Sequence, residues 1–221
     1  MSWYEFWIFV HVVLFVYWLG ADLGVLLLAR RARDRHMPLE QRALLLEMAM
    51  KIDFTPRIAF VLMLPVGLQL AWTSGLLPGQ AWLPLLAWGI AALWLALVLR
   101  LAMTGGADPL LQRIQSAWLL TLALLMALAA LLPWLLPAIS WPGWFSGKLG
   151  LYALICLMAL GIDRAFQPVA HGFSLLAGDA KDAARGEALV GPGIDATLRI
   201  VVSLYVALMA AAWLGIVKPG F

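Results

Sequence analysis

The sequence predicts an all-α membrane protein: a six-transmembrane-helix bundle with a parallel internal repeat. Of its 221 residues, 64% are hydrophobic and only 12% are charged, whereas soluble domains have about 25% charged residues. The chain also holds six apolar stretches, each long enough to cross a bilayer at roughly 20 residues per span. We therefore expect one integral membrane domain over residues 1–221, with the lipid bilayer as its main partner.

Apolar runs, cut at charge clusters and at Pro and Gly turns, predict the helices in order. They are 3–30, 54–73, 81–103, 111–136, 145–167 and 195–217. The first has no basic region before it, so we interpret it as a retained span rather than a signal peptide. Within residues 38–51 apolar side chains recur at helical spacing: Leu39, Ala43, Leu46 and Met50. This spacing predicts either an amphipathic helix on the membrane surface or a continuation of the second span.

The distribution of Lys and Arg predicts the orientation. Thirteen of the 15 lie within 30–57, 100–113 and 164–199, and only Lys148 and Lys218 fall on the opposite side. By the positive-inside rule, both termini are then extracytoplasmic in a bacterial-type inner (plasma) membrane, and the net charge of +3 reflects topology rather than nucleic acid. Eight tryptophans near the outer helix ends predict an interfacial aromatic belt: Trp3, Trp7, Trp72, Trp82, Trp134, Trp141, Trp144 and Trp213.

Two parts of the chain repeat one another. Three matches stand at offsets of 141 or 142: 52–58 with 194–200, 19–22 with 160–163, and Trp3 with Trp144. Because the offset is nearly constant, the first two helices and the last two are expected to be copies of one hairpin, with the middle pair between them.

The repeat concentrates charge near the inner ends of these four helices. The layer comprises Asp22, Asp53, Arg57, Asp163, Arg164, Asp195 and Arg199. Asp53 and Asp195 are expected to open the second and sixth helices, where a carboxylate complements the helix dipole. We also expect ion pairs Asp22–Arg57 and Asp163–Arg199, the latter shared with Arg164. Such a layer is interpreted as a structural lock, or as a proton or ion pathway.

His11 is the one histidine expected within the bilayer, since His36 and His171 are placed at the interface. It lies about 12 Å into the first helix, with Trp18 and Asp22 near the same face. The repeat places Tyr152 in register with His11 and Lys148 one turn outward, so His11, Trp18, Lys148 and Tyr152 form a candidate site. We consider four roles for His11: haem ligand, copper ligand, proton relay, or hydrogen-bond partner of another helix.

Other chemistries have little support. The methionines are scattered without a Met-x-x-Met cluster, and the one cysteine, Cys156, lies in an apolar run. The chain has no Gly-rich phosphate loop and no His-Glu-x-x-His zinc spacing, which argues against hydrolytic or nucleotide-driven function.

A short set of motifs resembles a known group of membrane proteins. His11, Trp18 and Gly20 are followed by a basic loop, by Asp53-x-x-Pro56-Arg57 and by Leu64-Pro65-x-Gly67. This part, residues 1–75, resembles the group containing the copper-resistance D membrane proteins and the HemJ-type protoporphyrinogen oxidases, and looks closest to an uncharacterised branch of small integral membrane proteins. The HemJ likeness implies haem b on His11 with Lys148 as a second group, and the copper-resistance likeness implies a copper path through His11. HemJ-like proteins have about four spans, against six here.

We therefore expect a membrane haem-binding redox protein with His11 as axial ligand. One alternative is a transporter for copper or a small solute, gated by the inner Asp/Arg pairs. Another is a non-catalytic subunit or assembly factor of a membrane complex. Homo-oligomers or a larger complex are expected partners, and whether the protein is an enzyme stays open.

Overall fold

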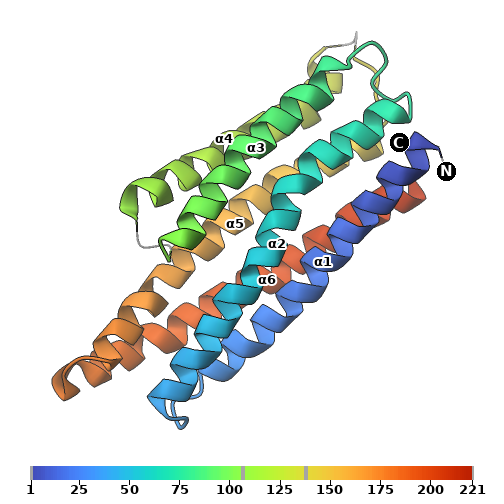
Figure 1. The fold of residues 1–221 in the computed structure, drawn as a ribbon. Coiled ribbons are helices and arrows are strands. Elements are labelled where there is room, and N and C mark those ends of the chain that lie inside the picture. The colour runs from blue at the N-terminus through green and yellow to red at the C-terminus, as the bar shows by residue number, and fades with distance from the viewer. Residues whose placement is uncertain (1, 106–107, 137–138, 221) are drawn as a thin grey trace. The chain divides into compact units, whose positions relative to one another are not determined.

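Six long α-helices make up the protein, as the computed structural model shows for residues 2–105, 108–136 and 139–220 (Figure 1). They are α1 (Trp3–Ala32), α2 (Leu39–Thr73), α3 (Trp82–Met103), α4 (Pro109–Leu135), α5 (Gly143–Leu176) and α6 (Ala183–Val217), with a short 3₁₀ helix η1 (Ala180–Asp182) before α6. These described residues contain no strand. All six α-helices are long and apolar enough to cross a membrane, which confirms the all-α, six-helix prediction.

The helices divide into two compact units. The first comprises Met1–Leu28 and Leu46–Gln115, and the second comprises Ala29–Leu45 and Ser116–Phe221. Each unit is described by itself below. The expected single membrane domain stays a prediction.

Three helices are longer at their basic ends than the sequence predicts. α2 begins at Leu39, so residues 38–51 are largely a continuation of the second span rather than a separate surface helix. α5 continues nine residues past 167, and α6 begins twelve residues before 195. Pro168 and Pro192 lie inside these helices without ending them.

The longer helices overturn the expected role of two carboxylates. Asp53 and Asp195 lie well inside α2 and α6, so neither opens a helix. The positive end of a helix dipole is confined to the first turn. Ion pairs with arginines, described below, stabilise these two carboxylates instead.

The buried stripe at the start of α2 also differs from the expected one. Leu46 is buried as predicted, but Ala43 and Met50 are exposed. The buried positions are Arg42, Leu46 and Ala49. The stripe is rotated because Arg42, a charged residue, turns inward to an ion pair with Glu187.

Glycines let α5 and α6 pack backbone to backbone. A Cβ atom built on Gly172 would lie 2.9 Å from the carbonyl oxygen of Gly186, and one on Gly186 would lie 2.8 Å from that of Gly172. A Cβ on Gly193 would lie 2.7 Å from a methyl carbon of Val169. Real Cβ atoms do not approach backbone so closely, so both Gly172 and Gly186 are required for this contact. The tight contact explains why the α5–α6 hairpin extends beyond the predicted spans.

The contacts between the helices of the two hairpins agree only in part, and the repeat stays a prediction. In the first hairpin a Cβ on Gly24 would lie 3.9 Å from Ile52. In the second, a Cβ on Gly193, the neighbour of Ile194, would lie 3.5 Å from the Ala165 carbonyl oxygen, close to the equivalent positions. A Cβ on Gly161 would lie 3.4 Å from Ile200, whereas one on Gly20, the equivalent of Gly161, meets nothing within 4 Å.

Replacing Gly172 with alanine is expected to lower the free energy of unfolding by about 1–3 kcal/mol, because the added methyl group overpacks a backbone contact. Gly191→Ala is the matched control, since a Cβ there meets no atom within 4 Å. Alanine in an open helical position is expected to add up to about 1 kcal/mol of stability. Reversible unfolding in mixed micelles measures both changes, and equal shifts in the two variants would contradict the close contact.

Candidate functional site

His11 lies against the backbone of the neighbouring helix. Its side chain on α1 is partly buried, and a Cβ built on Gly67 of α2 would lie 3.7 Å from its Cε1 atom. Gly67 has no side chain, so at this point the imidazole adjoins bare helix backbone. The structure thus brings together two of the motifs that carry the family resemblance, within the first unit.

A row of buried side chains crosses the first unit. The Trp18 ring lies 5.0 Å from the Phe60 ring, and Phe60 lies 4.9 Å from Trp94. Trp94 Nε1 donates a hydrogen bond of 3.2 Å to Gln115 Oε1. The row includes one residue from each of α1, α2, α3 and α4. Trp18 therefore faces the interior, as expected for the face that carries His11.

Asp22 is a buried carboxyl group close to other charges. Its side chain is only 7% exposed, and it interacts electrostatically with Asp53 and Arg57. Arg57 Nε lies 2.5 Å from Asp53 Oδ2, an ion pair between residues four apart on α2. The Asp22–Arg57 pair stays a prediction. This half of the charge layer thus combines two carboxyl groups and one guanidinium in the first unit.

The corresponding charges of the second unit are paired differently. Asp195 binds Arg33, which lies just past the end of α1, through two contacts of 2.7 Å. Arg199 follows Asp195 by four residues, as Arg57 follows Asp53, but its side chain is exposed. The ion pairs found among the described residues do not include Arg199, and the expected Asp163–Arg199 pair stays a prediction. The Arg199 side chain lines a groove between α5 and α6. No ion pair of Arg164 appears in this part of the chain either.

Arg42 forms a buried polar contact that sequence reasoning missed. Its guanidinium pairs with the Glu187 carboxylate, with Nη2 3.2 Å from Oε2, and its Nε donates to the Ala32 carbonyl oxygen at 2.9 Å. It also lies 5.4 Å from the centre of the Phe173 ring. The contact joins the end of α1, the start of α2, α5 and α6. A signal was present, because Arg42 falls on the apolar stripe, three residues after Leu39 and four before Leu46.

The Lys148 side chain on α5 lies against Gly215 of α6. Its Nζ would lie 2.7 Å from a Cβ built on Gly215, so a larger residue there would require the flexible end of the lysine to move. The charge of Lys218 acts on Lys148, and Lys218 lies 5.6 Å from the centre of the Trp144 ring. The two lysines predicted on the outer side are therefore neighbours.

Tyr152 and Cys156 are buried on α5, one and two turns further in from Lys148. Lys148 and Tyr152 belong to the second unit, whereas His11 and Trp18 belong to the first. That these four residues share one layer stays a prediction.

The described residues contain no group of three His, Cys, Asp or Glu side chains that could hold a metal ion. Comparison with protein-family models, curated proteins and solved structures finds no significant match for this chain. The resemblance to the copper-resistance D and HemJ-like group stays a prediction.

Removal of the Arg42 guanidinium by Arg42→Gln is expected to cost about 3 kcal/mol of unfolding free energy, because it leaves Glu187 without its cation. The expected loss of free energy is at the low end for buried ion pairs, because the Glu187 side chain is 33% exposed. The control Arg33→Gln breaks a pair whose side chains are 52% and 42% exposed, and should cost less than about 1 kcal/mol. Unfolding in mixed micelles compares the two, and similar losses would refute the assignment of Arg42 as the stronger contact.

Proposed function

We propose that this chain is a redox protein of a bacterial-type inner membrane that binds haem b through His11. The observation that carries the proposal is the position of the His11 imidazole against the bare backbone at Gly67. The positive-inside distribution of Lys and Arg supports extracytoplasmic termini and a position of His11 in the outer half of the membrane.

His11 is the residue that would hold a haem in the first unit. Imidazole is a common protein ligand of haem iron, and Gly67 beside it has no side chain that would cover the imidazole. Buried aromatic side chains on the same unit, Trp18 and Phe60, offer an apolar wall. When bound, haem supplies one-electron chemistry, and the protein orients the group and excludes water from it.

A second candidate function, transport of copper or a small solute, is favoured by Asp22. A carboxyl group that is 7% exposed within an apolar helix is costly, and such groups usually line ion or proton pathways. The pathway would pass Asp22 beside Asp53 and Arg57, with the repeated hairpins moving against the middle helices.

Protein purified in detergent from haem-replete cells is expected to show a Soret absorption band. His11→Ala should abolish the band because it removes the ligand, and Gly67→Leu should reduce it because the leucine fills the space beside the imidazole. His36→Ala and His171→Ala are matched controls and should retain it. A colourless wild-type preparation, or a band that survives His11→Ala unchanged, would rule out this site.

If transport is coupled to protons through Asp22, the protein should move protons in a way that depends on this residue. Vesicles containing the protein and an entrapped pH-sensitive dye should acidify under an imposed gradient, and Asp22→Asn should abolish this flux. Glu47→Gln is the control, since Glu47 forms only an exposed pair with Lys51. Absence of flux with the wild-type protein, or equal flux in Asp22→Asn, would reject the pathway.

A further inference from the structure

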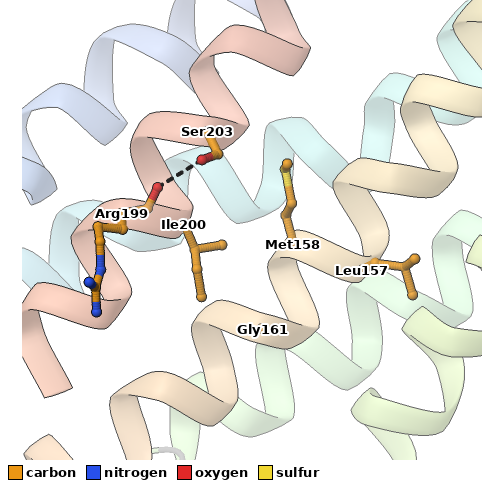
Figure 2. A pocket seen from close by; sticks show the side chains of 6 residues that line it. All are labelled: Leu157, Met158, Gly161, Arg199, Ile200 and Ser203. Carbon is orange, nitrogen blue, oxygen red and sulfur yellow. Dashed lines mark hydrogen bonds between the residues drawn. The ribbon is translucent and has the colours of Figure 1, made fainter.

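An open groove of about 370 Å³ lies between α5 and α6. Leu157, Met158 and Gly161 line it from α5, and Arg199, Ile200 and Ser203 from α6 (Figure 2). Gly161 leaves it open, because a Cβ there would come within 3.4 Å of Ile200. The Ser203 hydroxyl donates to the Arg199 carbonyl oxygen at 3.0 Å. Apart from the Arg199 guanidinium, the groove therefore presents an almost wholly apolar wall.

Arg199 marks one edge of the apolar part of α6. The 18 residues 200–217 carry no charge, and as a helix they span about 27 Å, close to the roughly 30 Å of a hydrocarbon core. Arg199 therefore lies where hydrocarbon meets headgroups, on the side predicted to be cytoplasmic. From there the groove extends toward the bilayer centre, to Ser203 and Leu157. Figure 2 shows the Arg199 side chain at the groove's edge, extending away from Ser203.

The carboxylate four residues before Arg199, that of Asp195, is engaged by another arginine. In the first copy of the repeat, Asp53 pairs with Arg57 four residues later. In the second copy, Asp195 instead pairs with Arg33, whose Nε lies 2.7 Å from Oδ1. Among the described residues, this exchange of partner leaves the Arg199 guanidinium without Asp195 and outside every ion pair found, beside an apolar groove.

We infer that this groove binds an anionic phospholipid of the basic-side leaflet, with its phosphate on Arg199 and an acyl chain between α5 and α6. Guanidinium groups match phosphate oxygens in charge and in hydrogen-bond geometry. Apolar side chains and a glycine suit an acyl chain. A phospholipid can contact both the Arg199 guanidinium and the apolar wall of the groove, whereas a free phosphate can contact only the guanidinium.

Native mass spectrometry of the purified protein tests the site, with phosphatidylglycerol and phosphatidylcholine of equal chain length as competing lipids. The wild-type protein is expected to prefer phosphatidylglycerol about fivefold, as one basic group near an anionic headgroup contributes about 1 kcal/mol. Arg199→Gln should remove the preference, whereas Arg57→Gln, its paired counterpart in the repeat, should keep it. Gly161→Leu should weaken binding of both lipids by filling the groove.

The carboxylate exchange gives a sharper test. Arg33→Gln should release Asp195 to pair with Arg199 at the favourable i,i+4 spacing, and so reduce the preference although Arg33 lies outside the groove. The double variant Arg33→Gln with Asp195→Asn should restore it, which loss of folding could not do. An unchanged preference in Arg199→Gln, wild-type binding in Gly161→Leu, or complete competition by equimolar glycerol 3-phosphate would overturn the proposal.

Discussion

The thickness of the bilayer is the constraint on which the rest of this structure depends. A hydrocarbon core of about 30 Å accommodates roughly 20 helical residues, but α2 and α6 each have 35 residues, or about 52 Å. The excess must lie among headgroups or in water. It falls at the basic ends, where Arg42 pairs with Glu187 and Arg33 with Asp195. These two ion pairs thus lie where the helices are expected to extend beyond the hydrocarbon core.

Within the apolar spans, polar groups are few and lie on specific helices. α1 carries both His11 and Asp22, 11 residues or about 16 Å apart, with the buried Trp18 between them. Both functional proposals for the first unit therefore depend on the same helix face. The haem proposal uses the imidazole against Gly67, and the transport proposal uses the carboxyl group beside Asp53 and Arg57.

The sequence was sufficient for features that depend on local pattern. Apolar length predicted six helices, which the structure confirms, whereas the repeat inferred from a nearly constant offset stays a prediction. Helix ends were harder, because the extension of α5 depends on Gly172 meeting Gly186 across the hairpin. Ion-pair partners were hardest, since Arg33 and Asp195 are 162 residues apart and nothing local links them. His11 was singled out by chemistry, but its contact with Gly67 needed the folded hairpin.

The different pairing of Asp53 and Asp195 shows how twin hairpins can diverge while keeping a common architecture. Both copies retain the aspartate and the arginine four residues later, so their sequences at this point look interchangeable. Their arginines are not equivalent, because a third residue in a connecting turn recruits one aspartate and not the other. The difference between the two copies is therefore set by Arg33, which lies in the turn of the first hairpin and outside the matched segments. A second hairpin placed in a chain without the first one's turn would be free to pair its aspartate with its own arginine.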